Sequence, residues 1–131
     1  MSIVQMLVST TMLIQERVAS EVFDVFEVRQ LTRATTLEPK VAVDQVFVKP
    51  GMRSGIHRHH HADTVLVISG GEGEVIVGDE VFQVSAGDRI HIPPGAFHGV
   101  KTDRMELSFI SIQTPPIQSN VTGILDLEMK G

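Results

Sequence analysis

The sequence predicts an all-β fold, built as an antiparallel sandwich or barrel, and three observations support this prediction. Short runs of alternating apolar and polar residues, rich in β-branched side chains, recur from Val22 onward. Clusters of glycine, proline and aspartate separate these runs at regular intervals. Gly78-Asp79 lies between two such runs and is a strong signal for a two-residue hairpin turn. Many short strands with regular turns are typical of a sandwich or barrel.

Eight strands are expected along the chain. Each combines alternation of period two with β-branched or aromatic residues, and turn signals such as Pro50-Gly51 and Gly70-Gly71 separate them. The expected strands span residues 26–31, 41–48, 64–69, 74–77, 81–84, 89–92, 98–101 and 107–113.

The two ends of the chain carry weaker patterns. Apolar residues within positions 3–8 would share one helix face, but the Ser-Thr-Thr that follows favours a strand. We therefore expect residues 1–20 to form an N-terminal accessory helix or strand that packs on a partner subunit. Pro115-Pro116 ends the last clear strand, so residues 115–131 are expected to form a surface tail. A single domain is expected over residues 1–131.

Composition excludes several classes of protein. The 131 residues, 42 % hydrophobic and 21 % charged, resemble a globular domain rather than a disordered chain. A net charge of −5 without a basic stripe argues against a nucleic-acid partner. No apolar stretch approaches the ~20 residues that span a bilayer, so no membrane association is expected. Cysteine is absent, which excludes disulfides and thiolate metal sites and fits a cytoplasmic location.

Six histidines give the first indication of function, because all of them fall between residues 57 and 98. Histidine supplies metal ligands and near-neutral acid–base groups. The chain has no tyrosine, so chemistry that needs a phenol is excluded. The histidines are His57, His59, His60, His61, His91 and His98.

Two segments can bring some of these histidines together. His57 and His59 are two residues apart, so in an extended chain both side chains point to one face. A turn before the next strand could bring Asp63 beside them. Two histidines and one carboxylate on one face suit non-haem iron and related divalent metals. Pro93 and the glycine two residues later can turn the chain so that His98 returns toward this cluster.

These segments resemble the two motifs of the cupin superfamily. The first motif is G-x5-H-x-H-x3-E-x6-G, and the second is G-x5-P-x-G-x2-H-x3-N. The chain matches the first with Gly51, His57, His59 and Gly70, and with Asp63 in the glutamate position. It matches the second with Gly87, Pro93, Gly95 and His98, and with Thr102 in the asparagine position.

The resemblance implies a small single-domain cupin, folded as a double-stranded β-helix or jelly-roll barrel, with its core motifs in residues 51–102. It implies one divalent transition metal per chain, which would be iron, manganese, nickel, zinc or copper. The implied ligands are His57, His59, Asp63 and His98, and they would leave one or two positions open for water or substrate. Small cupins commonly pair through sheet edges, so a homodimer is also expected.

Other residues near the motifs have alternative roles. Asp63 is one methylene shorter than glutamate, and His61 shares the alternation phase of the first two histidines, so His61 is the alternative ligand. His60 has the opposite phase and is expected to be solvated. His91 could line the barrel interior, but a structural role is favoured for it. Three arginines could hold a substrate carboxylate, although a solvated or salt-bridged face is favoured for them. They are Arg53, Arg58 and Arg89.

The function that the resemblance implies is a metal-dependent enzyme acting on a small polar molecule, with no catalytic residue assigned. A ferrous site would give dioxygenase chemistry, and a redox-inert metal would give isomerase or decarboxylase chemistry. The alternative is a non-catalytic cupin that binds a small ligand or senses a metal. Metal-free epimerase chemistry, which some cupins perform with a tyrosine acid, is disfavoured by the absence of tyrosine.

Overall fold

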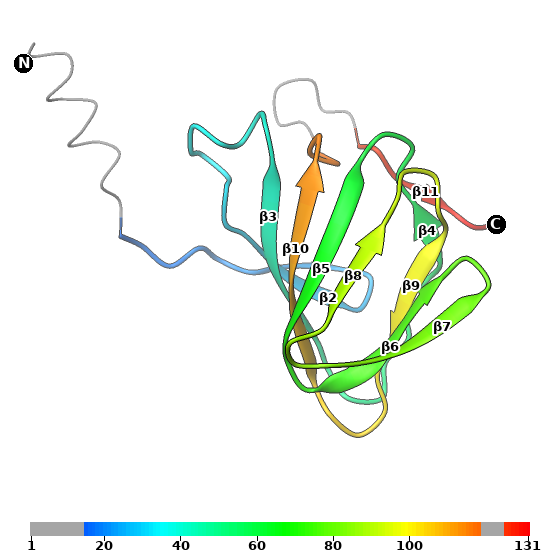
Figure 1. The fold of residues 1–131 in the computed structure, drawn as a ribbon. Coiled ribbons are helices and arrows are strands. Elements are labelled where there is room, and N and C mark those ends of the chain that lie inside the picture. Colours follow the sequence, from blue (N-terminus) through cyan, green and yellow to red (C-terminus); the bar gives the residue numbers. More distant parts are fainter. Residues whose placement is uncertain (1–14, 119–124) are drawn as a thin grey trace, which may run out of the picture.

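The fold is a sandwich of two antiparallel β-sheets (Figure 1). A computed structural model describes residues 15–118 and 125–131. Within these ranges the strands are β1 Glu21–Phe23, β2 Phe26–Gln30, β3 Ala42–Val48, β4 His57–Arg58, β5 Asp63–Gly70, β6 Glu72–Val77, β7 Glu80–Ser85, β8 Arg89–Ile92, β9 His98–Lys101, β10 Leu107–Thr114 and β11 Glu128–Met129. One sheet has the order β1-β2-β3-β10-β5-β8, and the other has the order β11-β4-β9-β6-β7. The described part of the chain contains no helix, and so none that could cross a membrane.

Each strand of the six-stranded sheet turns alternate side chains inward, as the period-two pattern requires. On β10 the inward side chains change character along the strand. Leu107 and Phe109 are buried and apolar, whereas Ser111 and Gln113 are buried and polar. One end of the strand therefore belongs to an apolar core and the other end to a polar interior.

The strands beside β10 show the same change from apolar to polar side chains, because the register places their inward residues opposite the inward residues of β10. Ser111 pairs with Asp44 on β3 and with Leu66 on β5, and Gln113 pairs with Thr64 on β5. Toward the opposite end of these strands the inward residues are apolar, namely Val46, Val48 and Ile68. The polar positions of three strands thus meet at one end of the sandwich.

The buried apolar side chains at one end of the sandwich stabilise the fold, because they are removed from water. Its most deeply buried members are at most 2 % exposed, and burying such a side chain contributes about 1.5–3 kcal/mol. They come from both sheets, so they hold the two layers together. They are Val48, Ile68, Val75, Ile92 and Leu107.

The predicted all-β jelly-roll fold is confirmed, and all eight expected strands are present with ends shifted by at most two residues. The hairpin expected at Gly78-Asp79 is also present, since Val77 pairs with Glu80 across it. Three short strands were not expected: β1, β4 and β11. Residues 1–14 of the expected accessory segment lie outside the described residues, and residues 15–20 form neither helix nor strand.

Gly71 is expected to tolerate no side chain. Its φ is +75°, and a Cβ placed there would lie 1.7 Å from the carbonyl oxygen of Glu106. Gly78 has a similar φ of +60°, but nothing lies within 4 Å of its added Cβ. Gly78→Ala should therefore lower the free energy of unfolding by about 1–2 kcal/mol through backbone strain alone. Gly71→Ala should lower the free energy of unfolding by about 1–3 kcal/mol more than Gly78→Ala, because the segments around Gly71 and Glu106 must move apart to make room for the methyl group.

Urea unfolding of the two glycine variants beside the wild type measures this difference. Equal losses for Gly71→Ala and Gly78→Ala would show that the close approach to Glu106 is relieved without cost.

Candidate metal centre

Three histidines meet inside the sandwich, and they come from two separate segments. His57 on β4 is the register partner of His98 on β9, and His59 follows two residues later on the same side of the chain. The three side chains are at most 7 % exposed. Their ring centroids are 4.3 Å (His57–His98), 5.1 Å (His59–His98) and 5.2 Å (His57–His59) apart. One ring nitrogen from each lies within 4.8 Å of the others.

Backbone carbonyls orient two of these rings. His59 Nδ1 lies 2.7 Å from the carbonyl oxygen of Asp126, and His98 Nδ1 lies 3.0 Å from that of Ala96. Since a carbonyl oxygen only accepts hydrogen bonds, Nδ1 carries the proton in both rings and Nε2 keeps its lone pair. Histidine ligands of metals are commonly fixed in this way. His57 Nδ1 is buried and forms no hydrogen bond of normal geometry among the described residues, although the Gly55 backbone near this ring raises its pKa and opposes the effect of burial.

Burial keeps the three histidines uncharged at neutral pH. Desolvation, with a smaller effect from His59, lowers the pKa of His57 to about 4. Desolvation also lowers the pKa of His98 to about 3, and the neighbouring His57 adds to the effect. The pKa of His59 is lowered by burial as well, although contacts with Asp126 oppose the shift. Neutral imidazole is the form that binds a metal ion.

The cluster fits a divalent transition metal on the chemistry of its donors. Imidazole nitrogen is a suitable ligand for zinc, copper, iron and nickel. Three neutral rings, each with a nitrogen within 4.8 Å of the others, form a set that an ion could complete. Three protein ligands also leave positions open for water or substrate, as in catalytic rather than structural sites.

Asp63 does not join this cluster, and its expected place among the ligands needs correction. The side chain is 52 % exposed on the outer face, where one carboxylate oxygen contacts His91 Nε2. Asp63 faces outward because of where the alternation of inward and outward side chains begins on β5. Thr64, Leu66 and the alternate residues after them face inward, so Asp63 faces outward. Thr64 faces inward instead and lines the same pocket as the histidines.

The other expected side chains lie on the surface. His61, the alternative ligand, is exposed and lies outside the cluster, while His60 is exposed as predicted. His91 is exposed and paired with Asp63. Arg58 forms an ion pair with Glu128, which supports the salt-bridged face favoured from the sequence. None of the three expected arginines lines the pocket that the histidines border.

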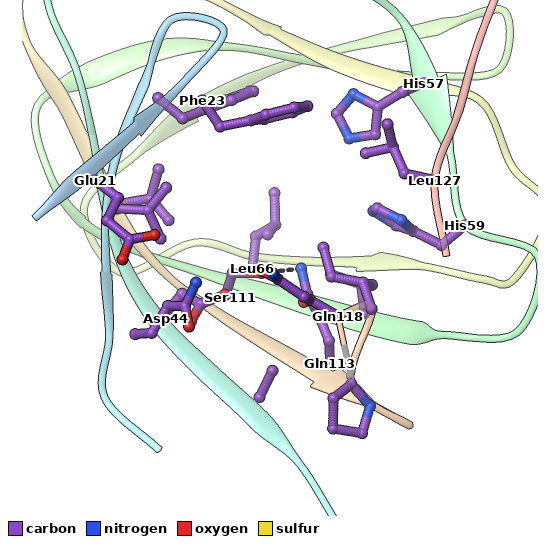
Figure 2. A pocket seen from close by; sticks show the side chains of 18 of the residues that line it. Glu21, Phe23, Asp44, His57, His59, Leu66, Ser111, Gln113, Gln118 and Leu127 are labelled. Atoms are coloured by element: carbon purple, nitrogen blue, oxygen red, sulfur yellow. Dashed lines mark hydrogen bonds between the residues drawn. The ribbon is translucent and has the colours of Figure 1, made fainter. Parts of the chain in front are cut away.

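The histidines form one wall of a pocket of about 390 Å³. Figure 2 shows His57 and His59 on one side, Asp44 and Glu21 on the other, and Ser111 and Gln113 between them. Sequence reasoning missed these polar residues. The available signal was the change from apolar to polar side chains at the inward positions of β3, β5 and β10.

The family model for the cupin domain matches residues 45–112, just over half of the chain. The chain is a cupin. Among curated proteins, this cupin is 27 % identical over 88 residues to an uncharacterized protein of Methanocaldococcus jannaschii, covering 66 % of this chain and 70 % of that protein. It is 32 % identical over 73 residues to the xanthan biosynthesis protein XanB of Xanthomonas campestris pv. campestris. That match covers 55 % of this chain but 16 % of XanB, so the cupin resembles a small part of it.

Solved structures with the same fold include a predicted oxalate decarboxylase from Thermotoga maritima, with a TM-score of 0.69 at 18 % identity. The match covers 76 % of this cupin and 95 % of that chain. A putative sugar phosphate isomerase from Acidithiobacillus ferrooxidans also has a TM-score of 0.69, at 19 % identity, over 84 % of this cupin and 79 % of that chain. At these identities the likeness shows the fold alone.

The C-terminal segment of this cupin helps to position the histidine cluster. The sequence predicted only a surface tail there. The Asp126 carboxylate accepts hydrogen bonds from the backbone N–H groups of His60, His61 and Ala62, at 2.7, 2.9 and 3.1 Å. Its own carbonyl accepts the bond from His59. Burial raises the pKa of Asp126, but these N–H groups outweigh it and hold the pKa below its ordinary value. Asp126 thus fixes the loop that carries His59.

Asp44 gives the pocket a pH-dependent charge. Burial raises its pKa from the ordinary 3.8 to about 6. Because the folded pKa is the higher one, protonation favours the folded state, and stability falls as the pH rises through about 6. We expect Asp44→Asn to be the more stable protein above pH 7 by about 1–2 kcal/mol, after allowance for partial solvent screening. Below pH 4 the advantage should vanish.

The free energy of unfolding of chelator-treated wild type and Asp44→Asn, measured between pH 3.5 and 8, tests this prediction. The difference between the two proteins should grow between about pH 4 and 7 and then level off. A difference that is independent of pH would mean that Asp44 is solvated in the folded protein.

Proposed function

We propose that this cupin is a metal-dependent enzyme that holds one divalent transition metal on His57, His59 and His98 and acts on a small polar molecule. The supporting observation is that these three uncharged, buried imidazoles form the wall of an open pocket that also contains a carboxyl group, Asp44. The pocket volume of about 390 Å³ suits a molecule of metabolite size.

The reaction class that we propose is Lewis-acid chemistry with proton transfer, as in an isomerase or decarboxylase. A bound divalent ion would polarise a carbonyl or carboxylate oxygen of the substrate. Asp44, with a pKa of about 6, can accept or return a proton at its carboxylate near neutral pH. Phe26, Leu66 and Phe109 line the same pocket and make part of its wall apolar.

A phosphorylated substrate is less well supported. Arg33 is the only lysine or arginine among the described residues that line the pocket, and its Nη1 already bonds Glu21 at 2.7 Å. Phosphate sites ordinarily present several cationic or backbone N–H groups. The substrate we propose is therefore a small organic acid or carbonyl compound without phosphate.

Turnover assays on metal-loaded protein test this proposal. Protein stripped by chelator is reloaded separately with Mn(II), Fe(II), Ni(II) and Zn(II), and small hydroxy and keto acids are assayed for carbon dioxide release and for isomerisation. We expect activity that Asp44→Asn abolishes without changing the metal content. Oxygen consumption with Fe(II) alone would instead indicate a dioxygenase. Tight binding without turnover under any metal would indicate a non-catalytic binding module.

We also propose that the protein is a homodimer. Val67 and Ile112 on the outer face of the six-stranded sheet are 37 % and 36 % exposed, and each lies beside a further apolar residue, Ile110 or Val65. A second copy would cover this apolar face and the neighbouring edge of β8. Sedimentation equilibrium should give about twice the 14.4 kDa of one chain, and a mass of one chain at micromolar concentration would contradict this.

A further inference from the structure

Three neutral polar side chains lie on the inner face of β5 and β10, within the pocket that contains the histidines. Thr64, Ser111 and Gln113 are 2 %, 3 % and 7 % exposed, so bulk water scarcely reaches them. Thr64 and Gln113 are direct cross-strand partners. We refer to these three side chains as the polar platform.

The platform contains hydrogen-bonding atoms that the protein leaves unused. Gln113 Nε2 donates to Ser111 Oγ at 3.0 Å, which holds the amide in place. Gln113 Oε1 and Thr64 Oγ1 are buried and have no partner among the described residues. Both atoms belong to residues that line the pocket. Buried polar atoms without partners are unfavourable, so a platform serving only the fold would be better built from apolar residues.

The unused atoms define the chemistry of a ligand. An amide oxygen such as Gln113 Oε1 accepts a hydrogen bond, whereas the Thr64 hydroxyl both donates and accepts. A hydroxyl group satisfies both requirements. The platform has no charged group, so it offers nothing specific to an ammonium or a carboxylate. Asp44 on β3 is the cross-strand partner of Ser111 and so lies next to the platform. Its carboxylate can accept a hydrogen bond from a further hydroxyl group of the ligand.

We infer that Thr64 and Gln113 form a hydroxyl-recognition subsite, and that the ligand of this pocket is a small polyhydroxylated acid. The inference rests on the proposed function, because the acid end of the ligand is assigned to a metal on the histidines. The hydroxyl groups along its chain lie on the platform. Thr64 and Gln113 thereby determine specificity for hydroxylated over plain carboxylic acids.

Three acids with the same six-carbon chain provide the test: hexanoate, 2-hydroxyhexanoate and gluconate. The second measures any gain from chelation next to the carboxylate, and the third adds the distal hydroxyls. Calorimetric titration of Mn(II)-loaded wild type should give gluconate at least about tenfold tighter binding than 2-hydroxyhexanoate. In Thr64→Val and Gln113→Met the ratio of gluconate affinity to 2-hydroxyhexanoate affinity should fall to about three or less. The affinity for hexanoate should not change.

A second measurement separates recognition from a structural role. In the ligand-free protein, Thr64→Val should keep or raise the melting temperature, because it removes an unpartnered buried hydroxyl and breaks no side-chain hydrogen bond. Gln113→Met serves only in the binding comparison, because it also removes the bond that Nε2 donates to Ser111. A lower melting temperature of Thr64→Val would overturn the inference. So would an unchanged ratio of gluconate to 2-hydroxyhexanoate affinity in the two variants, or the failure of all three acids to bind the metal-loaded protein. Failure of the protein to take up Mn(II) would instead contradict the proposed metal centre.

Discussion

Replacing His57, His59 or His98 by alanine is expected to lower the affinity for a divalent metal by more than about 100-fold, because even the loss of an outer hydrogen-bonding partner costs 10–100-fold. Each substitution removes one of only three donors and leaves two neutral imidazoles facing a void. Competition titration of the chelator-stripped proteins with Zn(II) and Ni(II) measures the change. Circular dichroism establishes that the variants retain the β-sandwich.

The same segment supplies matched controls for this prediction. His61→Ala removes an exposed imidazole that lies outside the cluster, and Asp63→Ala removes the carboxylate that contacts His91 on the outer face. Both should keep the wild-type affinity within about threefold, since surface changes remote from a site have small effects. A large loss in Asp63→Ala would return this residue to the ligand set and contradict the phase of β5.

Asp126→Ala is expected to weaken metal binding by about 10–100-fold and to lower the free energy of unfolding by about 1–3 kcal/mol. Its carboxylate is the acceptor for three consecutive backbone N–H groups of the loop that follows His59. Without that acceptor the loop loses its fixed conformation, and His59 is no longer held at the position that the cluster requires. Metal titration and urea unfolding of the same variant measure the two effects.

Glu128→Ala is the control for Asp126→Ala, because it lies two residues away in the same segment. Glu128 forms an ion pair with Arg58 in which both side chains are partly exposed, and such pairs contribute about 0–1 kcal/mol. We expect Glu128→Ala to leave metal affinity unchanged. If both variants lost affinity equally, the effect would belong to the docking of the whole C-terminal segment rather than to the Asp126 carboxylate.

The fold could be predicted from the sequence because its determinants are local. Each of the eight predicted strands contains its own alternation and its own turn residues, so its existence needs no knowledge of its neighbours. The strands β4 and β11 are two residues long each and exist because they pair with each other and β4 pairs with β9. No local pattern distinguishes a strand this short from a loop.

The three clustered histidines could be predicted, but the outward position of Asp63 could not. The spacing along the chain predicted that His57, His59 and His98 lie together. The first two point to one face of an extended chain, and the third follows a turn that can bring it back toward them. The same spacing placed Asp63 inside, yet the turn before β5 sets its phase so that Thr64 faces inward. Counting residues through a turn does not determine phase, and an error of one residue reverses the face.

Asp126 could not be found from sequence for a different reason. Its bonds join positions 64 to 66 residues apart, and an aspartate in a C-terminal segment resembles any solvated surface residue. The polar platform of Thr64, Ser111 and Gln113 was more accessible in principle. It interrupts the inward apolar pattern of two strands at positions that the antiparallel register aligns.

The metal content of the protein tests the central claim most directly. Wild type and His59→Ala are exposed to Mn(II), Fe(II), Ni(II) and Zn(II), dialysed, and analysed for bound metal by mass spectrometry of the elements. We expect about one divalent ion per wild-type chain for at least one metal, and less than about one tenth of that in His59→Ala. Equal metal content in the two proteins, or none in the wild type with any of the four metals, would contradict a metal centre built on these histidines.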